Sequence, residues 1–137
     1  MSSRKESTEQ NRNNPFTLKP SRISKIFITH LHGDHIYGLP ALLTSIGLSR
    51  VHKTAQSTLP IDIYGPPGLA HYLKTVFQIS DTKCNFPCII HELYSNPSDP
   101  RLDMMSPQKV QYEDKRMIVD PLFPSKEGYW DLFTVSI

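Results

Sequence analysis

The sequence predicts an α/β domain, because short apolar strands alternate with helical patterns along the middle of the chain. The segment 23–29 is β-branched and aromatic and holds no Gly or Pro, so it is a predicted strand. A helical pattern follows it. A second short strand, 60–64, comes next, and the turn cluster 65–68 separates this strand from a second helical pattern. At 137 residues the chain has the length of one modest domain.

The helices are predicted from the spacing of apolar residues. The first begins at Leu39 and repeats apolar residues at i, i+3, i+4 and i+7 as far as Ile46, with a polar loop expected over 49–59. The second is expected over 69–79, where apolar side chains again form one stripe. A third strand is expected over 88–94, because this run is apolar and β-branched.

The elements become shorter after this strand. Residues 95–108 are rich in Pro, Ser and Asp, so they are expected to form a loop. Strand fragments are expected near 115–119 and 132–137.

The polar start of the chain differs from the rest. Residues 1–21 are expected to form a disordered tail, and 22–137 to form one domain. Residues 1–25 hold six Lys or Arg against two Glu, a charge of +4, while the remainder holds nine against eleven, a charge of −2. Such a basic start is consistent with contact to nucleic acid or with a solvated tail.

Four residues able to bind metal follow the first predicted strand, in the run His30-Leu31-His32-Gly33-Asp34-His35. In an extended segment, residues i and i+2 point the same way, so His30 and His32 can converge on one ion. Gly33 allows the backbone to bend, and Asp34 and His35 can then engage a neighbouring ion. Imidazole nitrogen with carboxylate oxygen suits zinc, and also manganese or iron.

The pattern H-x-H-x-D-H after an apolar strand resembles the metallo-β-lactamase superfamily, whose fold is an αββα sandwich. The resemblance implies that His30 and His32 bind one metal ion and that Asp34 and His35 bind a second. Lactamases, thioesterases, phosphodiesterases and nucleases all belong to that superfamily, so the motif alone leaves the reaction open.

The residues that flank the motif are more specific, and they resemble ribonuclease Z in its short form. The run 38–43 (GLPALL) follows the motif at the family's spacing. The run 61–69 (IDIYGPPGL) is similar to the family's strand that ends in a Gly-Pro turn before a helix. The resemblance covers about residues 22–94.

This resemblance implies a zinc-dependent endoribonuclease that removes the 3′ trailer of precursor tRNA. It implies two Zn²⁺ ions per complete site, with Mn²⁺ as an alternative, and Asp34 as the catalytic proton acceptor. It also implies precursor tRNA as the substrate and a homodimer as the complete enzyme. Only part of the sandwich is expected here, without the N-terminal strands and the C-terminal half. The family's further ligands, a His, a bridging Asp and another His, have no counterpart in this sequence.

Two other functions stay open. Four ligands for two ions leave both metal sites incomplete, which favours a non-catalytic fragment with an interaction role. Another hydrolase of the metallo-β-lactamase fold, a phosphodiesterase or a thioesterase, is the second alternative. The contexts of Gly38 and of Gly65-Pro66 weigh against this last class.

The remaining cysteines and histidines are expected to play no part in metal binding. Cys84 and Cys88 are two thiols four residues apart with no second pair, so they are expected to be buried or idle. His52, His71 and His91 do not match the family's ligand motifs, so surface or core positions are expected for them.

No membrane association is expected, because no apolar run approaches the roughly 20 residues that a membrane span needs. The cytoplasm or the nucleus is the expected compartment, ahead of the mitochondrion. Glu6 and Glu9 interrupt the basic residues near the start, which is unlike a mitochondrial presequence.

Overall fold

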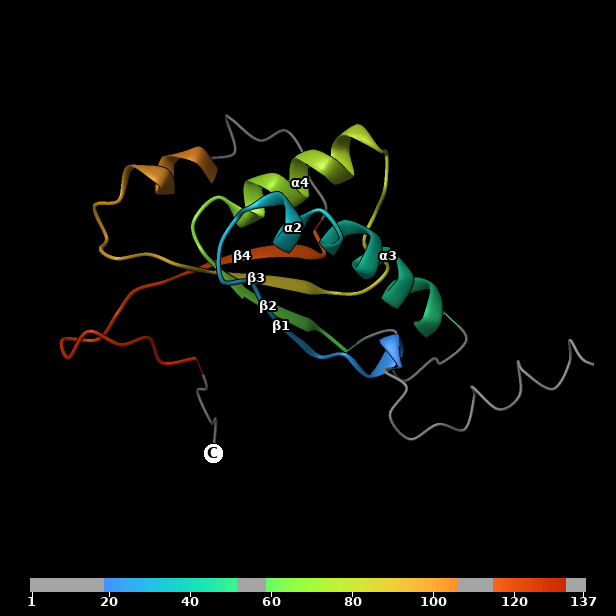
Figure 1. Cartoon of the computed structure of the whole chain (residues 1–137), viewed down its shortest axis with the longest axis horizontal. Helices are drawn as coiled ribbons and strands as arrows, with labels where there is room; N and C mark the ends of the chain where they lie inside the picture. Colours follow the sequence, from blue (N-terminus) through green and yellow to red (C-terminus); the bar gives the residue numbers. More distant parts are fainter. Residues whose placement is uncertain (1–18, 52–58, 106–114, 133–137) are drawn as a thin grey trace, which may run out of the picture.

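A four-stranded parallel sheet with helices on one face is the centre of the computed structural model, which describes residues 19–51, 59–105 and 115–132 (Figure 1). In chain order the elements are η1 (Pro20–Arg22), β1 (Lys25–Phe27), α2 (Gly33–Ile36), α3 (Leu39–Arg50), β2 (Ile61–Gly65), α4 (Leu69–Ile79), β3 (Cys88–Leu93), η2 (Pro100–Met105) and β4 (Met117–Leu122). The prediction of an α/β fold is confirmed.

The strands lie in the order β1-β2-β3-β4, and each pairs with its neighbour in parallel. In the middle of the sheet the register pairs Ile26 with Ile63, Ile63 with Ile90, and Ile90 with Val119. Because all four strands run the same way, their carboxyl ends meet at one edge, where open α/β sheets commonly hold their sites.

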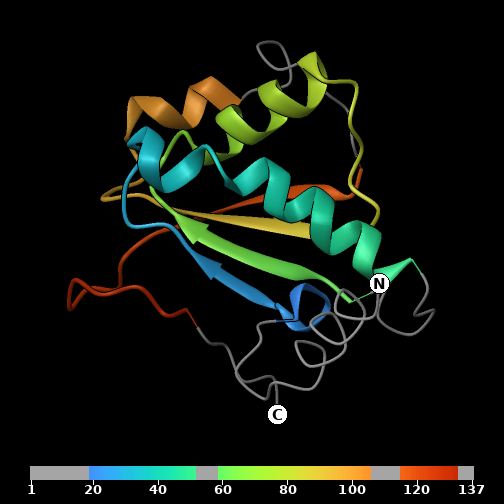
Figure 2. The same ribbon diagram turned by 45° about the vertical axis from the view of Figure 1, so that its right-hand side comes forward.

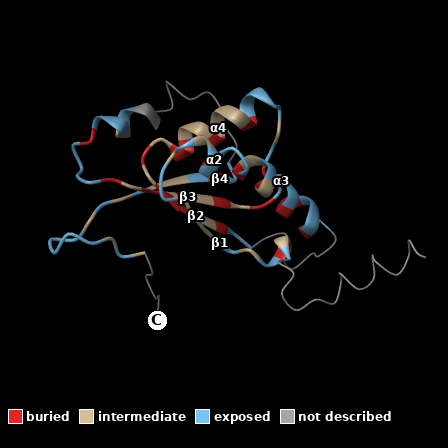
Figure 3. Cartoon of the chain, viewed as in Figure 1, coloured by how far each residue is buried: buried red, intermediate tan, exposed pale blue. Residues whose placement is uncertain are grey.

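The helices α3 and α4 cover one face of this sheet (Figure 2). Burial alternates along β3, so that every second side chain points toward the helices, and Figure 3 shows the resulting pattern of buried and partly exposed positions. The core is made by apolar side chains of β2, β3 and both helices: Leu39, Leu43, Ile46, Ile61, Ile63, Leu69, Ala70, Leu73, Phe77, Cys88 and Ile90.

Helix α3 is longer than its apolar pattern predicts, since it continues to Arg50 into the expected loop. The contacts of the Arg50 side chain support this two-residue extension. Its guanidinium is buried and donates hydrogen bonds to the carbonyls of Leu59 and Ile23, each at 2.7 Å. The guanidinium also lies over the ring of Phe86, 5.2 Å from the ring centroid. The contacts with Ile23 and Phe86 are long-range in sequence, so a local pattern does not reveal them.

Strand β1 is shorter than the predicted 23–29, but its backbone pairing extends further. The N–H of Ile28 donates to the carbonyl of Tyr64 at 2.8 Å, and the carbonyl of Ser24 accepts from the N–H of Asp62 at 3.0 Å. The predicted second helix and third strand are confirmed as α4 and β3.

Later segments differ from their predictions. The expected loop 95–108 contains the 3-10 helix η2, and the fragment near 115–119 is confirmed as part of β4, which continues to Leu122. The predicted strand at 132–137 is not seen at Leu132, and its other residues lie outside the described ranges. Most of the predicted tail 1–21 and the position of His52 also lie outside them.

Two further expectations concern the cysteines and membranes. Cys84 and Cys88 are buried and form no disulfide, which confirms the prediction of buried thiols. None of the helices in the described ranges has the length and apolar character that a membrane span requires.

Candidate metal centre

The predicted metal-binding residues lie at the carboxyl edge of the sheet. His30 and His32 are on the loop that leaves β1, while Asp34 and His35 are in the short helix α2. All four side chains are exposed. Gly33 begins α2 and is not among the described glycines with positive φ, which are Gly68 and Gly128. Gly33 thus has helical backbone geometry, and the sharp bend expected there is not seen.

The three imidazoles of the motif lie close together. The ring centroids of His30 and His32 are 4.7 Å apart, with an edge-to-face angle of 79°. The ring of His35 is 4.0 Å from that of His30, and its Nε2 is 3.3 Å from Oδ2 of Asp34. The structure thus brings all four predicted ligands into one cluster.

This cluster is not arranged around a single point. Within the described ranges, no three His, Cys, Asp or Glu side chains are placed so that they could hold one metal ion. His30 contacts both His32 and His35, while Asp34 pairs with His35. The division of the four residues between two ions therefore stays a prediction.

The hydroxyl of Thr29 is placed as a hydrogen-bond partner for the imidazole of His30. Oγ1 of Thr29 lies 2.9 Å from Nδ1 of His30. In the tautomer that carries its proton on Nδ1, His30 donates to Thr29 and keeps the lone pair of Nε2 for a metal. Metal-binding histidines commonly make such a bond with their second ring nitrogen, because it fixes the tautomer and the ring orientation. The donor set at this edge thus fits zinc.

The turn between β2 and α4 contacts the loop that carries His30 and His32. Gly68 has a φ of 100°, and a Cβ there would lie 3.3 Å from Cδ1 of Leu31, so a side chain at this position would require Leu31 to shift by a few tenths of an ångström. Leu31 stands between His30 and His32 in the sequence. Further along α4, the hydroxyl of Tyr72 donates to the carbonyl of Ile36, the last residue of α2, at 3.1 Å.

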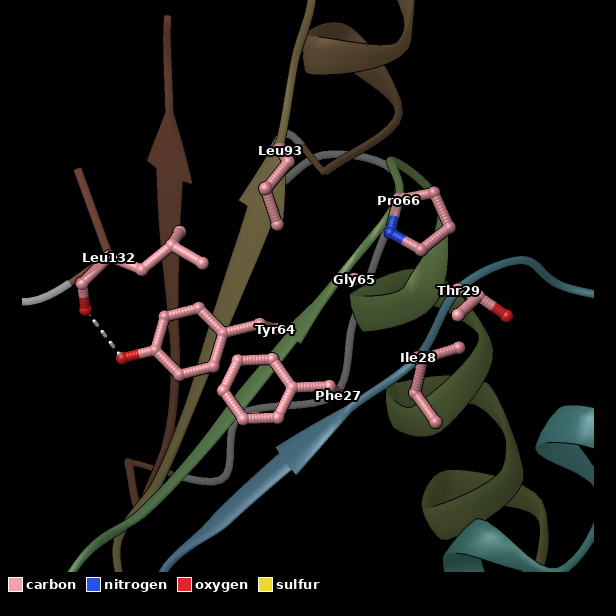
Figure 4. Close-up of a pocket in the computed structure, with 8 residues that line it drawn as sticks. All are labelled: Phe27, Ile28, Thr29, Tyr64, Gly65, Pro66, Leu93 and Leu132. Carbon is pink, nitrogen blue, oxygen red and sulfur yellow. Dashed lines mark hydrogen bonds between the residues drawn. The ribbon is translucent and has the colours of Figure 1, made fainter. Parts of the chain in front are cut away.

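An apolar pocket of about 320 Å³ adjoins the motif at the same edge (Figure 4). It is lined by residues of β1, β2 and β3, of the segments that directly follow β1 and β2, and of the segment after β4: Phe27, Ile28, Thr29, Tyr64, Gly65, Pro66, Leu93 and Leu132. The hydroxyl of Tyr64 donates to the carbonyl of Leu132 at 3.2 Å and so ties the C-terminal segment to the sheet.

A polar cluster on the sheet face opposite the helices is missing from the sequence predictions. His91 lies between two carboxylates: its Nε2 is 2.9 Å from Oδ1 of Asp62, and its Nδ1 is 2.8 Å from Oδ2 of Asp120. Lys25 makes an ion pair with Asp62 at 3.3 Å. Each residue belongs to a different strand. Period-two alternation could have placed them on one face, but only once the strand order and register were known.

The charges around Asp62 have a definite effect on it. Burial raises the pKa of this carboxyl, but the hydrogen bonds and positive charges of His91 and Lys25 outweigh burial. The pKa of Asp62 therefore lies below its ordinary value. The carboxylate stays ionised and can hold both neighbours.

Comparisons with known proteins agree with this architecture. The zinc phosphodiesterase ELAC protein 1 of Bos taurus is 49% identical over 111 residues, which are 81% of this chain and 28% of that protein. Ribonuclease Z of Leuconostoc mesenteroides is 46% identical over 71 residues, 52% of this chain and 21% of that protein. The chain thus spans between a fifth and a third of the length of these relatives.

A solved structure gives the same result. The crystal structure of human tRNase Z, short form (ELAC1), superposes with a TM-score of 0.60 and 32% identity, covering 95% of this chain and 40% of that one. Residues 11–84, more than half of the chain, match the model of the metallo-beta-lactamase superfamily. The matched segment includes the motif His30–His35, and the chain belongs to the metallo-beta-lactamase superfamily.

Proposed function

We propose that this chain carries half of the two-zinc site of an endoribonuclease that removes the 3′ trailer of precursor tRNA. The observation that carries the proposal is the cluster of His30, His32, Asp34 and His35 at the carboxyl edge of the sheet. The names of its relatives, ribonuclease Z, zinc phosphodiesterase and tRNase Z, support this reaction over the other reactions of the superfamily.

His30 and His32 are the residues that would hold one zinc ion, and Asp34 and His35 those that would hold the second; Mn²⁺ is an alternative metal. When bound, such ions activate water near neutral pH and stabilise the negative charge that develops on the scissile phosphate. Thr29 orients the imidazole of His30. Asp34 is the proton acceptor for the attacking water, a role that needs an exposed carboxylate beside the reacting phosphate.

The proposed substrate is held mainly through its phosphates and the shape of its RNA. The products are a tRNA with a free 3′ hydroxyl and a trailer with a 5′ phosphate. A homodimer as the complete enzyme, and the cytoplasm or the nucleus as its compartment, belong to the same proposal.

The test combines zinc binding with cleavage. Zinc is titrated into the 137-residue chain while the imidazole NMR signals of His30 and His32 are followed, and the same protein is then incubated with precursor tRNA. We expect both signals to shift with zinc. In any preparation that cleaves, we expect Asp34→Ala to abolish cleavage, whereas Asp103→Ala, at an exposed carboxyl of η2, leaves it unchanged. Cleavage that persists in Asp34→Ala would contradict the role of Asp34.

A second candidate is a non-catalytic chain with an interaction role. It is favoured by the exposure of all four ligands and by the absence, in the described ranges, of three side chains placed to hold one ion. This candidate predicts weak zinc binding and no turnover of precursor tRNA. Two tightly bound metal ions per chain, measured by elemental analysis after gel filtration, would refute it.

A further inference from the structure

Glu92 is a buried carboxylate on the core face of β3. Its exposed fraction is 0%, and the side chains at the alternate positions before it, Ile90 and Cys88, are apolar core residues. A carboxylate in such surroundings is costly unless its oxygens accept hydrogen bonds. The partners of Glu92 therefore indicate what the residue does.

Two of the three partners of Glu92 are backbone N–H groups at the start of helix α4. One oxygen, Oε1, accepts from the backbone N–H of Gly68 at 3.0 Å and from that of Ala70 at 2.8 Å. The other, Oε2, accepts from the hydroxyl of Tyr94 at 2.6 Å. The first N–H groups of a helix have no partner within the helix, and a negative charge is favoured there. Glu92 therefore stabilises the first turn of α4 from a neighbouring strand.

The same turn contacts the segment that carries His30 and His32. A Cβ at Gly68 would lie 3.3 Å from Leu31, and a Cβ at Gly65 would lie 3.3 Å from Cβ of Ile28. Leu31 lies between His30 and His32 in the sequence, so the turn contacts the loop between the two histidines. Leu31 and Ile28 also pack against the core cluster, which makes their position sensitive to a shift of α4.

We propose that Glu92 is a positioning residue for His30 and His32, acting through Gly68 and Leu31. The carboxylate fixes the β2–α4 turn by two hydrogen bonds, the turn fixes Leu31 by close packing, and Leu31 fixes the loop that carries the two imidazoles. The part of this proposal that concerns metal affinity rests on the proposed function, whereas the part that concerns side-chain position does not.

The test compares three variants of the 137-residue chain. Glu92→Leu removes both acceptor oxygens with little change in size. Glu92→Gln keeps one oxygen for Gly68 and Ala70 and is the conservative rescue. Ile90→Val is the matched control, because it removes one buried methylene group from the same face of the same strand and removes no hydrogen bond to the turn. Each variant is examined without metal for the nuclear Overhauser contact between the Leu31 methyls and Gly68, and for the imidazole signals of His30 and His32.

Glu92→Leu is expected to lose the contact and to shift or broaden both imidazole signals, while Glu92→Gln and Ile90→Val keep them. In a zinc titration, Glu92→Leu is expected to bind zinc about tenfold more weakly than the parent chain. A loss of about tenfold in affinity is the lower end of the range seen when a group that supports a metal ligand is removed. If Glu92→Leu does not fold, Glu92→Asp, whose carboxylate is one methylene short of the turn, is expected to show the same losses.

A folded Glu92→Leu or Glu92→Asp variant with the contact and both imidazole signals unchanged would overturn the proposal. So would a loss of the contact in Ile90→Val equal to that in Glu92→Leu. If the parent chain binds no zinc at these imidazoles, zinc binding by this chain fails as part of the proposed function. The metal-free signals then still decide the role of Glu92.

Discussion

The imidazole of His91 stacks on the ring of Tyr64, with centroids 4.5 Å apart and planes 14° from parallel. Phe27 stacks on the other side of Tyr64 at 5.0 Å, so an aromatic column crosses three neighbouring strands on the face opposite the helices. Tyr64 is only 5% exposed because of these neighbours, whereas Phe27, at the end of the column, is 54% exposed. The face is thus organised by stacking and charge rather than by an apolar core.

His91 is expected to contribute measurably to stability, because both its ring nitrogens contact carboxylates. The substitution His91→Leu should lower the free energy of unfolding, measured in urea, by about 1–2 kcal/mol. This value is smaller than that for fully buried hydrogen bonds to charged groups, because both carboxylates are partly exposed. A double-mutant cycle with Asp120→Asn should give a coupling energy above error. An unfolding energy equal to that of the parent chain would contradict this expectation.

The lowered pKa of Asp62 predicts how stability changes with pH. An unfolded Asp titrates near pH 3.9, so the folded carboxyl contributes stability above that value and loses it as the pH falls through the lower folded pKa. The free energy of unfolding of the parent chain should therefore fall below about pH 4. Asp62→Asn should show a shallower fall.

Asp103→Asn serves as the control for this titration, because it removes an exposed carboxyl of η2. Its pH dependence should follow that of the parent chain. The same acid slope in Asp62→Asn and in the parent chain would show that Asp62 is not responsible.

Gly68→Ala should be more harmful than an ordinary Gly-to-Ala change. The backbone at this position has a positive φ of 100°, which disfavours any residue with a side chain, and the new Cβ would lie 3.3 Å from Leu31. The strain alone should cost about 1–2 kcal/mol in the free energy of unfolding. Gly128→Ala is the matched control, because Gly128 also has a positive φ, of 86°, but nothing lies within 4 Å of its Cβ position. Only Gly68→Ala should also shift the NMR signals of His30 and His32.

Arg50 should be important for the C-terminal end of α3. Arg50→Met keeps much of the aliphatic length but leaves the carbonyls of Leu59 and Ile23 without their donor. The loss should be about 1–3 kcal/mol in the free energy of unfolding, the range for buried polar groups left without a hydrogen-bond partner. Arg22→Met, at an exposed arginine of η1, should change the free energy of unfolding little. Helix content from circular dichroism should fall only in Arg50→Met.

The sequence alone predicted much of the framework. The α/β class, helix α4, strand β3 and the location of the motif after β1 all follow from local patterns of apolar residues and turn signals. The residues His30, His32, Asp34 and His35 were found for the same reason, since their spacing within six positions is local. Such features depend on neighbours in the chain, which a single sequence displays directly.

Other features were decided only by the tertiary structure. The bond from Arg50 to Ile23, the bonds of His91 with Asp62 and Asp120, and the bond of Glu92 with Gly68 join residues 24 to 29 positions apart. Each needs the register of parallel strands or the packing of a helix on the sheet, which no local pattern contains. The sequence therefore determined which residues could bind a metal, and the fold decided what holds them in place, because long-range contacts arise only when the strands are aligned.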